Sequence, residues 1–164
     1  MSERLGLREL LERLARAEVR FVLIGGLAVN AWGHVRATRD LDLVPDPDVA
    51  NLDRLADLLE SLDGRVQVAE GRLGPSAIRT FLRAGDRTLV DTSSGPVDVL
   101  QGMPQIPGFD ALDAEAVEVD LDGLPVRVCS LAALLEMKRA STRSRDRHDL
   151  EALEAAHADA PGEY

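Results

Sequence analysis

The chain has 164 residues, of which 45% are hydrophobic and 29% charged, as expected for one globular domain with a substantial core. Its net charge of −10 disfavours nucleic-acid binding through general electrostatics, although arginines 139, 143, 145 and 147 cluster near one end. One cysteine and three histidines argue against disulfides and a zinc site. A charged N-terminus and the lack of a long apolar run predict a cytoplasmic protein without a membrane partner.

The N-terminal third contains the most informative local patterns. Leucines at positions 7, 10, 11 and 14 predict an amphipathic helix over 2–17. The apolar run 19–24 predicts a buried strand, which Gly25 and Gly26 end. A short helix is expected over 26–33, with Trp32 in the core.

Residues 38–44 alternate strictly between polar and apolar side chains and predict a second strand. On this strand Asp40 and Asp42 share one face, with Cβ atoms about 6–7 Å apart. Two carboxylates this close repel each other unless a proton or a cation lies between them. Oxygen ligands of this kind are those that Mg²⁺ prefers.

The glycine pair adds a second half to this pattern. Gly25 and Gly26 carry no side chains, so their backbone N–H groups can approach a phosphate, next to the start of a helix. Together the two features predict metal-assisted phosphoryl or nucleotidyl transfer. The alternative is a plain turn followed by two solvated aspartates on an edge strand; the order and spacing of the two motifs favour the site.

The run GGLAVNAWGHVRATRDLDLV (25–44) resembles the nucleotidyltransferase (polymerase-β-like) superfamily. It is similar to the branch of AbiEii-like toxin-type nucleotidyltransferases, in which Gly-Gly often replaces the usual Gly-Ser. The resemblance implies an α/β fold with a mixed, twisted sheet that carries the carboxylates on one edge, flanking helices and a C-terminal helical hairpin. It also implies one domain over 1–164, with a core at 19–129 and the hairpin at 130–158.

The middle of the chain supplies a candidate third carboxylate. After a helix that starts at Asp46-Pro47-Asp48 and ends at Asp63-Gly64, strands are expected at 65–69, 87–91 and 97–100. Residues 70–85 give no clear pattern: a loop, then a short helix or strand over 76–83. Asp98 lies between Val97 and Val99, and a carboxylate on a core strand needs a partner or a metal. The resemblance implies that Asp98 completes the metal site; Asp91 is the alternative.

The C-terminal third begins with one helical turn at 109–113. A hairpin follows at 116–121 and 124–129, joined by Asp122-Gly123. Ser130 is expected to cap a helix over 131–141, Asp146 to open a last helix, and 157–164 to be a frayed tail.

The run SLAALLEMKRASTRSRDRHDLEAL (130–153) also resembles this branch, through Lys138, Arg143, Asp146 and Asp149. A lysine here could neutralise triphosphate charge, with the two aspartates holding it or an arginine in place. From spacing alone, exposed ion pairs of little energetic value are the simpler reading. Ser144 stands where the family usually has proline, which affects the rigidity of the loop.

The resemblance implies transfer of a nucleoside monophosphate from an NTP to a hydroxyl of RNA, foremost tRNA, or of protein. The chain would then be the toxin of a toxin–antitoxin pair, with a cognate antitoxin as partner. The alternative is a non-catalytic binding or antitoxin-like module with the same fold. The residues assigned are Asp40, Asp42 and Asp98 for two Mg²⁺ ions and catalysis, Lys138 for catalysis, and Gly25, Gly26, Arg39 and Asp149 for the nucleotide.

Overall fold

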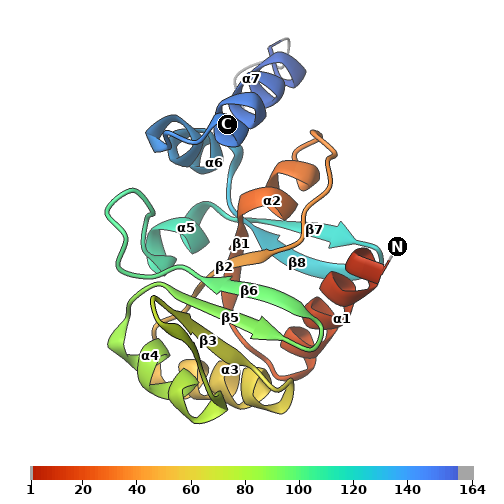
Figure 1. Cartoon of the computed structure of the whole chain (residues 1–164). Helices are drawn as coiled ribbons and strands as arrows, with labels where there is room; N and C mark the ends of the chain where they lie inside the picture. Colours follow the sequence, from red (N-terminus) through yellow and green to blue (C-terminus); the bar gives the residue numbers. More distant parts are fainter. Residues whose placement is uncertain (1, 159–164) are drawn as a thin grey trace.

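The computed structural model describes residues 2–158 and places one mixed sheet at the centre of the molecule (Figure 1). The strand order is β4-β3-β5-β6-β2-β1-β8-β7. In chain order, the elements are α1 (Ser2–Arg16), β1 (Phe21–Ile24), α2 (Gly25–Ala31), β2 (Leu41–Pro45), α3 (Val49–Ser61), β3 (Arg65–Val68), β4 (Gly71–Leu73), a 3₁₀ turn (Pro75–Ala77), α4 (Ile78–Ala84), β5 (Thr88–Thr92), β6 (Gly95–Val99), α5 (Phe109–Glu115), β7 (Val117–Leu121), β8 (Leu124–Val128), α6 (Leu131–Ala140) and α7 (Ser144–Ala156).

The predicted fold class is confirmed: the sheet is mixed, helices flank it, and a helical hairpin ends the described chain. Strand β2 pairs antiparallel with β1 and parallel with β6, with Asp42 opposite Asp98 in the register. Both carboxylate strands therefore lie in the middle of the sheet. The expectation that they would lie at an edge is wrong, because β1, β8 and β7 add to one side of β2, and β5, β3 and β4 to the other side of β6.

The apolar half of each predicted pattern forms the core. Leu41 and Leu43 are fully buried on β2, while Asp42 between them is only half-buried. The predicted stripe of α1 is buried as well, at Leu7, Leu10, Leu11 and Leu14. The alternation of β2 and the helical period of α1 were therefore reliable guides to which side chains face the core.

Several element boundaries differ from the expected ones. Strand β2 begins at Leu41, so residues 38–40 precede it. They continue a loop that Asn30 of α2 holds at Arg36, where the Asn30 side chain donates to the backbone carbonyl and accepts from the backbone N–H, each at 3.0 Å. Helix α2 begins directly at Gly25, α5 continues to Glu115, and α7 begins at Ser144 instead of Asp146.

The unclear region 70–85 contains β4, the 3₁₀ turn and α4. All three β4 residues are exposed, so no apolar alternation marked that strand. Of the expected frayed tail, residues 159–164 lie outside the described residues.

The helical hairpin of α6 and α7 lies at one end of the molecule, beside α2 and far from α3 and α4 (Figure 1). Trp32, which follows α2, contacts the chain where it passes from the sheet to the hairpin. Its indole Nε1 donates to the carbonyl of Cys129, between β8 and α6, at 2.9 Å. His157, after α7, contacts the Trp32 carbonyl at 2.8 Å through Nε2. Across residues 2–158, the helices are too short or too polar to cross a bilayer.

Candidate active site

A cavity of about 720 Å³ lies between the sheet, the loop after α2 and the helical hairpin. Six basic and four acidic side chains line it, an excess of positive charge in a chain whose net charge is −10. The structure thus gathers here most of the residues that the sequence singled out: Gly25, Gly26, Arg39, Asp40, Asp42, Asp98 and Lys138. Asp149 does not line the cavity but contacts Lys138 from behind, at 3.0 Å between carboxylate and ammonium.

Two carboxylates lie side by side on the floor of this cavity. Asp42 and Asp98 are register partners on parallel strands, about 4.8 Å apart along the hydrogen-bonding direction, so their side chains leave the same face of the sheet. Burial, followed by the negative charges of Asp98 and Asp40, raises the pKa of Asp42 to about 7; Lys138 and Arg143 oppose this. Asp98 and Asp40 therefore both act electrostatically on Asp42, although Asp40 is exposed and precedes the strand.

Arg87, which the sequence did not single out, forms a two-bonded ion pair with Asp98. Its Nε and Nη2 donate to the two carboxylate oxygens of Asp98 at 3.2 and 2.8 Å. The alternative third carboxylate, Asp91, lies outside the cavity and pairs with Arg72 at 2.5 Å. Arg87 lies two residues before Leu89, which is the register partner of Asp98. A prediction of this strand pairing from the sequence would have placed Arg87 beside Asp98.

The carboxylates are the right kind of donor for Mg²⁺, which prefers oxygen ligands. Among residues 2–158, however, no group of three Asp, Glu, His or Cys side chains is arranged to hold a metal ion. The ion pair with Arg87 holds the carboxylate of Asp98, and Asp40 lies outside β2. The carboxylates thus fit Mg²⁺ because they offer oxygen ligands and because a cation would relieve the repulsion between their negative charges. Asp98 could join Asp42 as a ligand only after it gives up its ion pair with Arg87.

The two glycines lie where larger residues would not fit. Gly25 has φ +69°, and a Cβ added there would collide with the carboxylate of Asp42. A Cβ at Gly26 would lie 2.6 Å from the hydroxyl oxygen of Thr38. The glycine pair therefore allows the start of α2 to lie directly against Asp42 and the loop before β2.

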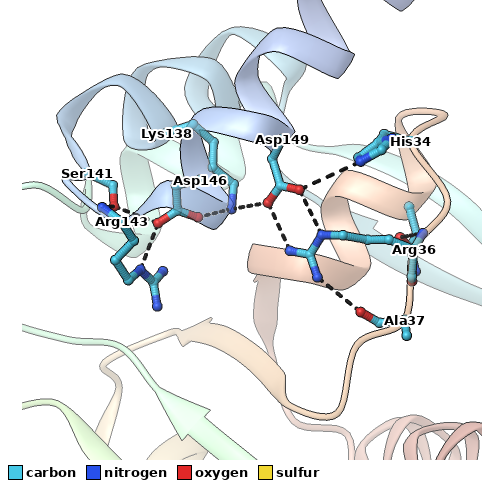
Figure 2. A network of polar contacts seen from close by, with 9 residues as sticks. His34, Arg36, Ala37, Lys138, Ser141, Arg143, Asp146 and Asp149 are labelled. Atoms are coloured by element: carbon cyan, nitrogen blue, oxygen red, sulfur yellow. Dashed lines mark hydrogen bonds and ion pairs between the residues drawn. The ribbon is translucent and has the colours of Figure 1, made fainter.

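A buried network of ion pairs connects the hairpin to this site (Figure 2). The Lys138 ammonium, only 7% exposed, contacts Asp146 Oδ1 at 2.5 Å and Asp149 Oδ2 at 3.0 Å. Ser141 and Arg143 donate to the other oxygen of Asp146, at 2.5 and 2.8 Å. Burial raises the pKa of Asp146, but hydrogen bonds from Lys138, Ser141 and Arg143 outweigh it and lower the value to about 2.

Arg36 extends the network from the hairpin to the loop after α2. Its Nε and Nη2 donate to the two oxygens of Asp149 at 2.7 and 2.9 Å, and His34 lies 3.9 Å from the same carboxylate. Burial acts to raise the pKa of Asp149, but these bonds and that of Lys138 lower it. The sequence alone could not identify Asp149 as the partner of Arg36, because 113 residues separate the two.

A scan against protein-family models and a search of curated proteins find no match to this chain. Solved structures do match. The lincosamide antibiotic adenylyltransferase LnuA, bound to lincomycin, superposes with a TM-score of 0.65 at 16% identity, over 92% of this chain and 95% of that one. ANT(2'')-Ia in complex with adenylyl-2''-tobramycin gives 0.59 at 15% identity, over 92% and 86%. A nucleotidyltransferase-like protein from Paracoccidioides brasiliensis gives 0.58 at 20% identity, over 94% and 75%.

These similarities extend over 92–94% of the chain. At identities of 15–20%, these superpositions establish the fold alone, and the substrate and the reaction have to be inferred from the residues of the site. The chain therefore has the nucleotidyltransferase-like fold.

Proposed function

We propose that the protein is a metal-dependent nucleotidyltransferase that moves a nucleoside monophosphate from an NTP to a hydroxyl group. The observation that carries this proposal is the pair Asp42 and Asp98, in register beside the Gly25-Gly26 turn and in a cavity that six basic side chains also line. Carboxylates for the metal ions and cations for the phosphates are what a triphosphate with its metal ions requires.

In the proposed reaction the acceptor oxygen forms a bond to the α-phosphorus, the bond from the α-phosphorus to the bridging oxygen breaks, and pyrophosphate leaves. Asp98 accepts or orients the proton of the attacking hydroxyl. The backbone N–H groups of Gly25 and Gly26 bind the β- and γ-phosphates. Arg39 adds positive charge at the nucleotide. Lys138, which lines the same cavity and is held in place by Asp149, contributes to the positive potential there and helps to balance the phosphate charge.

Asp40, Asp42 and Asp98 would hold two Mg²⁺ ions. When bound, such a pair neutralises phosphate charge and aligns the attacking and leaving oxygens. The raised pKa of Asp42 supports this role, because burial and two neighbouring negative charges make a cation favourable there.

The acceptor follows first from the resemblance of the two motif regions to the toxin-type branch. On that basis the acceptor is RNA, foremost tRNA, or a protein side chain, and the modified acceptor is inactivated. A cognate antitoxin would then be the regulatory partner.

A compact, hydroxylated small molecule is a second candidate acceptor, favoured by the cavity itself. Uncharged side chains also line the cavity, among them those of Leu89, Met103, Gln105 and Ile106. The chain's charge of −10 also disfavours a polyanion. Two of the structures with this fold carry lincomycin and an adenylylated tobramycin.

The test is transfer of label from each α-³²P-NTP, with Mg²⁺, to total tRNA, cell protein, lincomycin and tobramycin as separate probes. We expect one nucleotide and one acceptor class to give a product. Asp42→Asn and Asp98→Asn should each lower the rate at least roughly 100-fold, because charge stabilisation at the reacting phosphate is lost. Asp91→Asn is the matched control, since Asp91 lies on the adjacent strand outside the cavity.

The proposed nucleotidyltransferase activity would be contradicted if the wild-type protein neither binds any NTP in the presence of Mg²⁺ nor labels any acceptor. That result would favour the binding or antitoxin-like module, in which complex formation survives Asp42→Asn unchanged. Equal loss of activity in Asp91→Asn would show that the effect is not local to the cavity.

A further inference from the structure

The basic residues of the hairpin network differ sharply in how fully their charges are matched. Arg36, Lys138 and Arg143 carry three positive charges, while Asp146 and Asp149 carry two negative ones. Lys138 lies between both carboxylates, and Arg36 makes two bonds to Asp149. The unmatched charge of the network therefore falls on Arg143.

Arg143 also has the most accessible side chain of the three. It is 77% exposed, against 19% for Arg36 and 7% for Lys138. Its contact with Asp146 uses only Nε, and Figure 2 shows the end of its guanidinium pointing away from Asp146 and out of the hairpin. A guanidinium held at Nε presents its terminal N–H groups in a fixed direction, which suits a phosphate.

Two further observations relate the guanidinium of Arg143 to the carboxylate site. Arg143 lines the same cavity as Asp42 and Asp98. Its positive charge also acts on the carboxyl of Asp42 across the cavity. The hairpin loop thus places Arg143 on the cavity that the carboxylates also line. Ser141 and Asp146 fix the backbone and the Nε of Arg143: Ser141 accepts from the Arg143 backbone N–H at 3.3 Å and donates to Asp146, which accepts from Arg143 Nε.

We propose that Arg143 is the residue of the hairpin that binds the terminal phosphates of the nucleotide, and that Lys138 and Asp146 are positioning residues that act through it. This inference rests on the proposed function. It divides the contribution of the hairpin: Arg143 makes the direct contact, and the buried lysine holds together the two carboxylates that orient the arginine and the loop after α2.

The experiment is equilibrium binding of inorganic tripolyphosphate and of each NTP, all with Mg²⁺, by calorimetry. Arg143→Gln should weaken tripolyphosphate at least about ten-fold, the loss expected for one charge-assisted contact. It should leave nucleoside monophosphate binding unchanged and keep the wild-type melting temperature. Arg143→Lys should restore part of the affinity. Arg139→Gln is the matched control, because Arg139 is also an exposed arginine of the hairpin but pairs with Glu154 outside the cavity.

A double-mutant cycle tests the positioning role. Asp146→Asn should weaken tripolyphosphate in the wild-type background and have little further effect in the Arg143→Gln background; a purely structural role for Asp146 would give equal losses in both. Tripolyphosphate binding to Arg143→Gln with wild-type affinity, while Asp42→Asn loses NTP binding, overturns this inference alone. Wild-type protein that binds neither tripolyphosphate nor any NTP overturns the proposed function as well.

Discussion

Gly25 shows how one residue can serve backbone and site at once. Its φ of +69° lies in the left-handed region, and its Cα faces the carboxylate of Asp42 on the neighbouring strand. The sequence predicted that a glycine here would leave backbone amides open. It gave no sign of the contact with Asp42, because the register of β1 and β2 that creates this contact depends on tertiary pairing.

Gly25→Ala should therefore be harmful in two ways. A left-handed non-glycine residue costs about 1–2 kcal/mol of stability, and the added Cβ must displace the Asp42 carboxylate. We expect a lower melting temperature together with loss of NTP binding. Gly33→Ala is the control: its φ is +106°, but nothing lies within 4 Å of the added atom, so only stability should fall. Unchanged NTP binding in Gly25→Ala would contradict the proposed closeness of turn and carboxylate.

At the scale of elements, the helical hairpin was recognisable but its interior was not. The caps and apolar periods of α6 and α7 lie within short windows, and Ser130 does cap α6, accepting from the Ala133 N–H at 3.1 Å. Spacing alone favoured exposed ion pairs of small value. Lys138, Asp146 and Asp149 are instead at most 7% exposed, because α2 and the loop after it cover that face. Burial of this kind depends on packing partners distant in the sequence.

Adjacent residues of α6 should consequently respond very differently to the same substitution. Lys138→Met leaves two buried carboxylates without their shared cation and should cost about 3–5 kcal/mol of unfolding free energy. Arg139→Met breaks an exposed pair with Glu154 and should cost no more than about 1 kcal/mol. Urea denaturation of both variants measures the two values. Similar small losses in both would mean that the Lys138 cluster contributes little.

At the scale of the whole molecule, charge is unevenly distributed. The chain carries −10, yet its cavity has more basic than acidic side chains. Composition could exclude a generally basic nucleic-acid surface but could not locate this local reversal. The cavity collects residues from the loop after α2, from β2 and β6, and from the hairpin, and only the folded sheet brings these segments together.

The buried carboxylates should also shape the global stability at acid pH. In the folded state the pKa of Asp146 is about 2 and that of Asp149 is lowered, whereas an unfolded aspartate has a pKa of about 3.9. Depressed values stabilise the fold above the unfolded pKa, and that contribution is lost as pH falls from about 4 to about 2. The Asp146 part amounts to roughly 2 kcal/mol. Unfolding free energies measured across this window should fall less steeply for Asp146→Asn; parallel curves would contradict the assignment.

The position of Trp32 has an optical consequence. It is the only tryptophan of the chain, and it lies at the joint between sheet and hairpin, bonded to Cys129 and in edge contact with the His157 ring at 6.1 Å between centroids. Emission excited at the red edge of protein absorbance therefore comes from this one indole. Any movement of α7 against α2, whether caused by nucleotide, partner or temperature, changes the solvation of that indole, so the unlabelled protein carries its own reporter of hairpin docking.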